Sequence, residues 1–181
     1  MSKVAKATIG LMLATIIAKV LGFGRELALA SAYGASGVSD AFLVAMNIPA
    51  VIFTAIGTSL GTAFIPLYCE VNANKGEQSS NKFTNNVFNI VVIICIVISV
   101  IGAIFTPQIV KIFAVGFEGE TLRLAIYFTR VMILGLAFLG MSYIMMAYLQ
   151  VKENFIIPGF MSVPYNILII ISIIVSVKIS P

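Results

Sequence analysis

Three ionisable residues, Lys19, Arg25 and Glu26, lie within eight positions of an otherwise apolar stretch that runs from about residue 7 to residue 33. A stretch of this length and composition is typical of a membrane-spanning helix. A cation at bilayer depth costs about 2.5–3.5 kcal/mol on insertion scales, so such residues are retained where they face a protein interior or a water-filled cavity. The three charges therefore favour a transport pathway over a lipid-facing anchor.

The spacing of these charges allows two interpretations. At about 100° per residue, Lys19 and Glu26 share one face of a regular helix, and Arg25 points about 120° away from Lys19. Gly22 and Gly24 could act as a hinge that brings both cations toward one cavity. In the functional interpretation, Lys19 and Arg25 bind an anion such as phosphate, and Glu26 orients Arg25 or takes part in ion coupling. In the alternative, the charges form an internal ion pair and Lys19 snorkels toward the interface.

Four further residues are candidates for such a site. Asp40 stands at the expected start of the second helix, where it is either an N-cap or, close to Arg25, a gate or salt-bridge partner. Pro49 removes a helical donor and marks a kink or hinge, and Asn47 beside it is a candidate for lining a cavity. Arg130 lies deep in a later helix, and the sequence names no partner for it.

Composition places these residues in a polytopic membrane protein. Of 181 residues, 60% are hydrophobic and 10% charged, with a mean hydropathy of +1.10, whereas soluble domains carry about 25% charged residues. The net charge of +4 is dispersed, so the chain has no basic cluster suited to nucleic acid. With no histidine and a single aspartate, it offers little for a metal or cofactor site. Its acidic residues are scattered, so we expect no catalytic residues and no enzyme activity.

The elements that must position these residues are helices, and the sequence predicts five transmembrane spans. They cover about residues 7–33, 40–68, 84–105, 121–150 and 156–177. The polar residues from Glu70 to Lys82, and those from Pro107 to Glu120, are expected to form loops. Counting Lys and Arg beside the spans, with Lys3 and Lys6 among them, favours a cytoplasmic N-terminus.

Three stretches carry a family signature: Lys19-Val-Leu-Gly-Phe-Gly-Arg25-Glu26, Ala30-Ser-Ala-Tyr-Gly-Ala-Ser and Ser39-Asp40-Ala-Phe-Leu-Val-Ala. Together they resemble the amino-terminal signature of the MurJ (MviN) family, the lipid II flippases of bacterial peptidoglycan synthesis. Asn47-Ile48-Pro49, Ala63-Phe64-Ile65-Pro66 and Gly116-Phe117 are similar to further family positions. The resemblance extends over essentially the whole chain.

The resemblance implies a fold of the multidrug/oligosaccharidyl-lipid/polysaccharide exporter superfamily, in which two helical lobes surround a central cationic cavity. Residues 1–181 would then form most of the amino-terminal lobe of a longer transporter, and we expect the chain to be truncated. By the same resemblance, Lys19 and Arg25 bind the pyrophosphate of lipid II, and Asp40 lies by the outer gate. The implied function is export of lipid II across the bacterial cytoplasmic membrane by alternating access, without a cofactor.

Two departures from the family pattern keep alternatives open. The stretch Ala50–Thr54 carries no cation where relatives often have arginine, and Lys19 stands where many relatives have arginine. An ammonium group lacks the bidentate fork of a guanidinium, so the substrate clamp is expected to differ. One alternative is therefore an exporter of another lipid-linked polysaccharide or of a drug in the same superfamily. Another is a non-transporting membrane scaffold or one half of a split gene.

Overall fold

A computed structural model describes the backbone of residues 3–179 and the side chains of residues 9–54 and 57–179. Within these residues every regular element is a helix, which confirms the expected all-α membrane protein. The helices are α1 (Lys3–Tyr33), α2 (Gly37–Ile104), α3 (Thr106–Phe113), α4 (Gly119–Ile133), α5 (Leu136–Val151), α6 (Ile156–Phe160) and α7 (Ser162–Ile179). The chain divides into two compact units. Unit 1 comprises Met1–Ser39 with Lys152–Pro181, and unit 2 comprises Asp40–Val151.

Polar side chains within the apolar helices bond to their own helix backbone. The hydroxyl of Thr15 donates to the carbonyl of Leu11 at 2.8 Å, and the hydroxyl of Thr54 donates to that of Ala50 at 2.6 Å. Ser142 and Ser172 make the same bond one turn back along their own helices. In lipid no water can serve these hydroxyls, so bonding within the helix removes a large desolvation cost.

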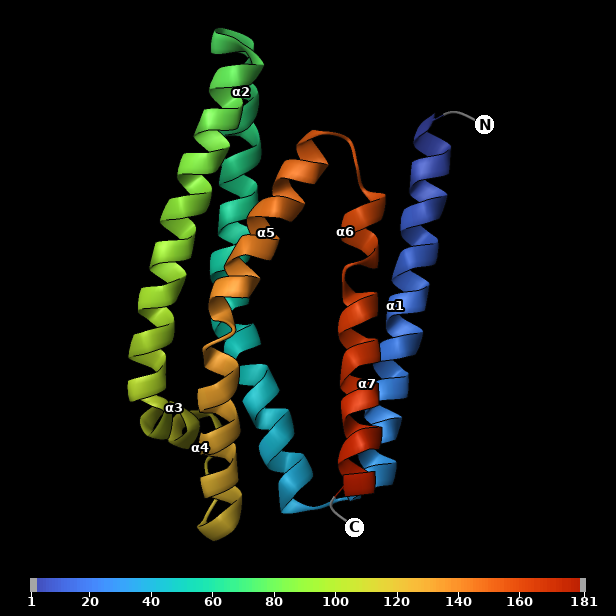
Figure 1. Ribbon diagram of the computed structural model, residues 1–181, viewed down its shortest axis with the longest axis vertical. Coiled ribbons are helices and arrows are strands. Elements are labelled where there is room, and N and C mark those ends of the chain that lie inside the picture. The colour runs from blue at the N-terminus through green and yellow to red at the C-terminus, as the bar shows by residue number, and fades with distance from the viewer. Residues whose placement is uncertain (1–2, 180–181) are drawn as a thin grey trace. The chain divides into compact units, whose positions relative to one another are not determined.

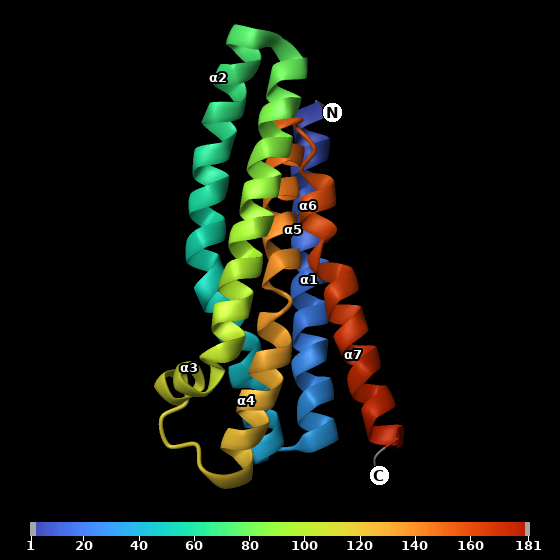
Figure 2. The ribbon, with the colours of Figure 1, turned by 60° about the vertical axis from the view of Figure 1, so that its left-hand side comes forward.

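The element α2 is a helical hairpin of 68 residues rather than one rod. Gly76 has a φ of 77° and a ψ of 174°, and it divides α2 into arms of residues 37–75 and 77–104. The two arms lie side by side in both ribbon views (Figures 1 and 2). At the bend, the hydroxyl of Ser80 donates to Asn72 Oδ1 at 3.1 Å and to the carbonyl of Glu77 at 2.9 Å. Glycine adopts this positive φ without steric cost, so one residue suffices to reverse the chain.

Both expected loops around the second arm are therefore shorter than the sequence predicted. Residues 70–82 are helical on either side of Gly76, although most of their side chains are exposed, as expected for a solvated segment. The segment expected as a loop from Pro107 to Glu120 contains α3, which begins at Thr106 with Pro107 in its first turn. Proline is favoured there because its missing N–H has no helical partner in any case.

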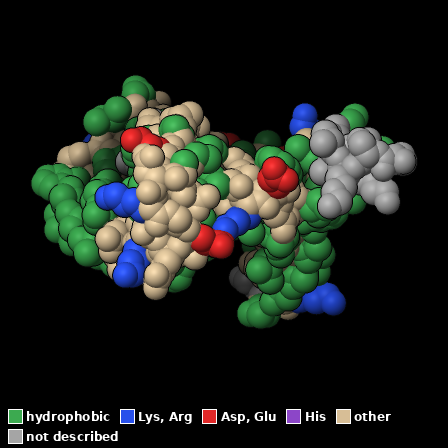
Figure 3. Space-filling view, turned by 90° about the horizontal axis from the view of Figure 1, so that it is seen from above, with side chains coloured by type: hydrophobic (Ala, Val, Ile, Leu, Met, Phe, Trp, Pro, Cys, Tyr) green, Lys and Arg blue, Asp and Glu red, His purple; other side chains and the backbone are tan. Residues whose placement is uncertain are grey.

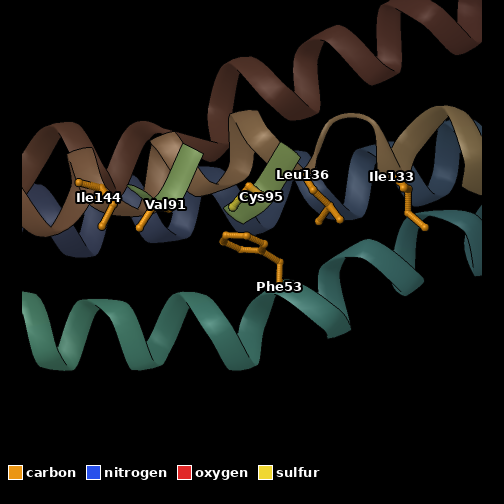
Figure 4. Close-up of a cluster of buried hydrophobic side chains, with 6 residues drawn as sticks. All are labelled: Phe53, Val91, Cys95, Ile133, Leu136 and Ile144. Carbon is orange, nitrogen blue, oxygen red and sulfur yellow. The ribbon is translucent and has the colours of Figure 1, made fainter. Parts of the chain in front are cut away.

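The core of unit 2 is a cluster of large apolar side chains from three elements. Its buried members are Phe53, Val91, Cys95, Ile133, Leu136 and Ile144, drawn as sticks in Figure 4. Phe53 points from the first arm of α2 toward Cys95 of the second arm, and its ring centroid lies 5.4 Å from that of Tyr143 on α5. A Cβ atom on Gly140 would lie 2.6 Å from the Cys95 sulfur, so only glycine lets α5 approach this closely.

Unit 1 consists of α1 packed against α6 and α7, which run in the same direction along it (Figures 1 and 2). The contacting pairs advance along both partners in the order Gly10–Ile156, Ala14–Gly159, Gly24–Ile170 and Tyr33–Ser176. A Cβ atom on Gly159 would lie 3.0 Å from that of Ala14, so small residues bring the helices together here. At the far end, the hydroxyl oxygens of Tyr33 and Ser176 lie 2.6 Å apart and share a hydrogen bond.

Two helical segments of the described chain are long and apolar enough to cross a membrane, Gly37–Ile104 and Ile156–Ile179. The pair Gly119–Ile133 and Leu136–Val151, bent by 44° at its break, is a third if it is counted as one span. Each of the five ranges expected as a span coincides with helix: α1, the two arms of α2, the α4–α5 pair and the α6–α7 pair. How many of them cross the membrane stays a prediction.

Candidate functional site

The position of Arg25 on α1 is set by a stripe of small and apolar residues that packs toward α6 and α7. Ala14 is fully buried, and Ala18 and Leu21 are half-buried, at spacings of three and four residues along one face. Arg25 continues this stripe one turn beyond Leu21, and its side chain is 20% exposed. The stripe that packs unit 1 together therefore contains a guanidinium group.

Glu26 is the acidic partner of Arg25. Arg25 Nη2 donates to Glu26 Oε1 at 2.6 Å, and the Glu26 side chain is 47% exposed. Because the two residues are adjacent, the bond joins the packed face of α1 to its exposed side. The internal ion pair that the sequence left open is present, and charge-assisted bonds of this length are stronger than neutral ones.

Lys19 lies on the exposed side of the same helix. Helical geometry places it about 120° from Arg25 and on the face of Glu26, and its side chain is exposed. It makes no ion pair within the described part of the chain. The ammonium group is thus available to a ligand or to the membrane interface, as both interpretations of the sequence required.

The two glycines expected as a hinge do not interrupt α1. The helix is continuous through Gly22 and Gly24. A Cβ atom on Gly22 would meet no other atom within 4 Å, and one on Gly24 would lie 3.9 Å from Ile170. Hinge motion at these positions stays a prediction, because a single conformation does not test it.

Asp40 lies in the first turn of α2 rather than at its N-cap. The cap is Ser36, whose hydroxyl accepts a hydrogen bond from the backbone N–H of Ser39 at 3.4 Å, and the Ser39 hydroxyl donates to the Gly34 carbonyl at 2.9 Å. Asp40 is exposed there, where its carboxylate is favoured by the helix dipole. Its part in a gate or salt bridge stays a prediction.

Asn47 and Pro49 belong to the first arm of α2. The Asn47 amide nitrogen donates to the carbonyl of Leu43 at 2.9 Å, which uses its own helix rather than a neighbour. Pro49 is buried inside the helix, and the assigned helix continues through it. Neither observation tests a cavity or hinge role for these two residues.

Arg130 has a partner that the sequence did not reveal. Its Nε donates to the carbonyl of Ala103 at 3.2 Å, near the end of α2. The last carbonyls of a helix have no partner within the helix and carry the negative end of its dipole, so a cation is favoured at this position. The bond gives Arg130 a structural role as a cap, alongside the cavity role predicted for it.

Asn166 is the polar residue that sequence reasoning missed. It lies on α7, is 6% exposed, and donates from Nδ2 to the carbonyl of Ser162 at 2.9 Å. Its Oδ1 has no hydrogen-bond partner among the residues that the structure describes. The signal available in the sequence was an amide near the middle of the expected span 156–177. Such a residue is expensive in lipid and therefore usually serves a purpose.

The charges of unit 1 are of the kind that suits an anion. On the face seen in Figure 3, charged side chains form isolated spots among hydrophobic and other polar ones. The described residues contain no group of three or more metal-ligating side chains. What unit 1 offers is one partly buried guanidinium, one exposed ammonium and one carboxylate, all on an apolar helix.

Comparisons with known proteins agree with this picture. A family model described as lipid II flippase MurJ matches residues 29–180. A probable lipid II flippase MurJ from Buchnera aphidicola subsp. Baizongia pistaciae is 31% identical over 173 residues, covering 94% of this chain and 34% of that protein. One from Aquifex aeolicus is 28% identical over 178 residues, covering 97% and 35%. The lipid II flippase MurJ of Burkholderia cenocepacia is 28% identical over 157 residues, covering 84% and 30%.

The matches differ in how much of the relatives and of the candidate site they cover. The chain spans about a third of the length of these relatives. The family model begins at residue 29, after Lys19, Arg25 and Glu26. No solved structure matches the chain.

Proposed function

The chain belongs to the lipid II flippase MurJ family, and on that premise we propose that it forms part of a flippase that carries lipid II across the bacterial cytoplasmic membrane. The observation that carries the proposal is the partly buried Arg25, bound to Glu26 at 2.6 Å on the same apolar helix as the exposed Lys19. Membrane helices retain such charges at sites of function.

In the proposed mechanism the chain binds, holds and releases an anionic headgroup without changing a covalent bond. The planar donors of Arg25 match two oxygens of a pyrophosphate, and Lys19 adds a point charge beside them. Rocking of helical lobes would expose the site first to one side of the membrane and then to the other. The drive would come from the membrane potential or from a coupled ion, with Asp40 at the outer gate.

Glu26 has a definite part in this proposal. It neutralises Arg25 while no substrate is bound, which lowers the cost of a guanidinium in apolar surroundings. A pyrophosphate carries the same sign of charge as Glu26, so the two compete for Arg25. Release of the headgroup is favoured each time Glu26 recovers its partner.

We also propose five membrane crossings with the N-terminus in the cytoplasm. In support, α1 and α7 run parallel, and parallel spans must be separated by an odd number of crossings. The two arms of α2 and the α4–α5 pair would supply three. The orientation rests on the Lys and Arg count beside the helices. The side chains of Lys3 and Lys6, which contribute to that count, lie outside those that the structure describes.

The experiment is complementation in cells depleted of their own lipid II flippase. It compares the chain as given, the chain joined to any coding sequence that follows it in its genome, and Arg25→Ala in whichever form rescues growth. We expect rescue to fall at least tenfold in plating efficiency with Arg25→Ala. The matched control is Arg123→Ala, because Arg123 is 81% exposed and its ion pair among the described residues is with Glu120 at 3.5 Å.

Three outcomes would count against the proposal. Rescue that is equal with and without Arg25 would remove the cationic site. Failure of every well-expressed form would point to another lipid-linked substrate or to a scaffold role. An equal loss with Arg123→Ala would indicate that lowered net charge or expression, rather than the site, limits growth.

A further inference from the structure

Among its described residues, unit 1 contains a hydrogen-bond acceptor and several hydrogen-bond donors that have no partner. Asn166 Oδ1 is buried and has no partner within the described part of the chain. A guanidinium has five N–H donors, and the described residues give that of Arg25 one hydrogen bond, from Nη2 to Glu26. A buried acceptor left unpaired costs stability, so its retention in an apolar helix calls for a state in which it is paired.

The register of α1 against α7 places Asn166 within one and a half helical turns of Arg25, on the N-terminal side. Gly24 contacts Ile170, and Ala14 contacts Gly159. Because the helices are parallel, Asn166, one turn before Ile170, lies level with α1 at about residue 20 or 21. Side chains on a helix lean toward its N-terminus, so the side chain of Arg25 extends from its own Cα toward that level. Arg25 also continues the stripe of α1 that packs toward α7.

We propose that Asn166 is a positioning residue for Arg25, holding its guanidinium in the substrate-bound state while Glu26 is displaced. This inference rests on the proposed function. In the described state the carboxylate of Glu26 accepts a hydrogen bond from the guanidinium of Arg25. When a pyrophosphate approaches, repulsion drives Glu26 away, and Asn166 Oδ1 accepts one N–H of the guanidinium.

The chemistry of the amide suits this task better than a second carboxylate would. A neutral acceptor fixes the orientation of the guanidinium without cancelling its charge, so the full attraction for the anion is kept. It uses one donor and leaves the others for the phosphate oxygens. The Nδ2 bond to the Ser162 carbonyl holds the amide so that Oδ1 stays available.

The test measures binding of undecaprenyl pyrophosphate, in detergent, to the form of the protein that rescues growth. Asn166→Leu keeps the size of the side chain and removes the acceptor. We expect affinity to fall about tenfold or somewhat more, the low end of the range for one hydrogen bond to a charged group. We expect the thermal unfolding temperature to stay the same or rise, because a buried unpaired acceptor is lost. A purely structural role would not lower affinity while stability is kept.

A double-mutant comparison then identifies the group through which Asn166 acts. In an Arg25→Ala background, Asn166→Leu should have no further effect on affinity, whereas in a Lys19→Ala background it should keep its full effect. Asn166→Asp provides a second variant. It retains the acceptor but adds a charge, so it should lower affinity more than leucine does. Ser99→Ala is the matched control, because Ser99 is another buried and unpartnered polar group, on α2.

The outcomes separate this inference from the proposed function. If Arg25→Ala leaves pyrophosphate binding unchanged, the cationic site itself is wrong. If Arg25→Ala weakens binding but Asn166→Leu does not, or weakens it equally in both backgrounds, Asn166 does not act through Arg25. A loss of affinity with Ser99→Ala of similar size would overturn the inference as well, because it would show a general response to losing a buried polar group.

Discussion

The two units of the molecule differ in the size of the side chains that make their closest contacts. Unit 2 surrounds Phe53 with aliphatic and aromatic residues from three helices, and several of its largest side chains are fully buried. Unit 1 packs α1 against α6 and α7, and Ala14 and Gly159 make the close contact between them. Alongside the buried Leu29 and Ile173, unit 1 contains the partly buried Arg25 and the buried Asn166.

The two units therefore differ in which interactions hold their helices together. In lipid, helices gain little from hiding apolar surface from one another, so close packing and hydrogen bonds hold them together. Unit 2 uses close packing, which defines one arrangement and resists change. Unit 1 packs through small residues such as Ala14 and Gly159, and under the proposal above its Arg25 exchanges Glu26 for Asn166. We therefore expect substitutions to affect stability chiefly in unit 2 and binding chiefly in unit 1.

The largest expected effect is the loss of stability when a buried aromatic side chain of unit 2 is truncated. Phe53→Ala should destabilise the protein by about 3 kcal/mol, the low end for a buried aromatic, because in lipid the loss is of packing more than of transfer from water. Phe23→Ala in unit 1 is the control, since Phe23 is 65% exposed. The measurement is the temperature of half-aggregation in detergent. Equal losses for the two variants would remove the distinction between the units.

A smaller effect is expected from adding a methyl group at a close contact. Gly140→Ala places a Cβ atom 2.6 Å from the Cys95 sulfur, and overpacking of this kind costs about 1–3 kcal/mol. The double variant with Cys95→Ala should recover most of the loss. Gly22→Ala is the counterpart in unit 1, where the added atom meets nothing within 4 Å, so stability should not fall. Destabilisation by Gly22→Ala would show that unit 1 is packed as tightly as unit 2.

The smallest effect should come from the hydrogen bond that ties the ends of α1 and α7. Tyr33→Phe removes the 2.6 Å contact with Ser176. Interhelical hydrogen bonds in membranes average about 0.6 kcal/mol, so the same unfolding assay should show a shift near its limit of detection. Deuterium exchange at the α7 backbone gives the sharper measurement, and we expect faster exchange confined to its last turns. Faster exchange along the whole of α7 would indicate that this bond, rather than the small-residue contacts, holds unit 1 together.

Much of the fold could be predicted because apolar length fixes where membrane helices lie. The chain leaves helix at residues 34–36 and 152–155, in the gaps between predicted spans. The bend in α2 was harder to locate, because the polar residues around it are as compatible with helix as with loop. The position of the bend is set by Gly76, because its positive φ reverses the chain within one residue. Pro49 and Pro66, the stronger signals in sequence, lie inside helix.

The site could be predicted only as far as it depends on one helix. Helical periodicity was enough to separate Arg25 from Lys19 and Glu26. The bond from Arg130 to Ala103 joins residues 27 positions apart, and the place of Asn166 depends on which α1 residues α7 meets. Neither follows from periodicity within one helix, because both are properties of how helices pair.

The bond between Arg25 and Glu26 also has a consequence for how the protein is made. Residue 156, where the helical partner of α1 begins, is synthesised about 120 residues after Tyr33, which at about 5–20 residues per second is an interval on the order of ten seconds. In the proposed topology, α1 resides in the bilayer without its partner during that interval. Because its guanidinium is bound by the very next residue, the helix enters the membrane with its counter-ion already in place. The nascent α1 therefore has no unpaired guanidinium in lipid while the rest of unit 1 is synthesised.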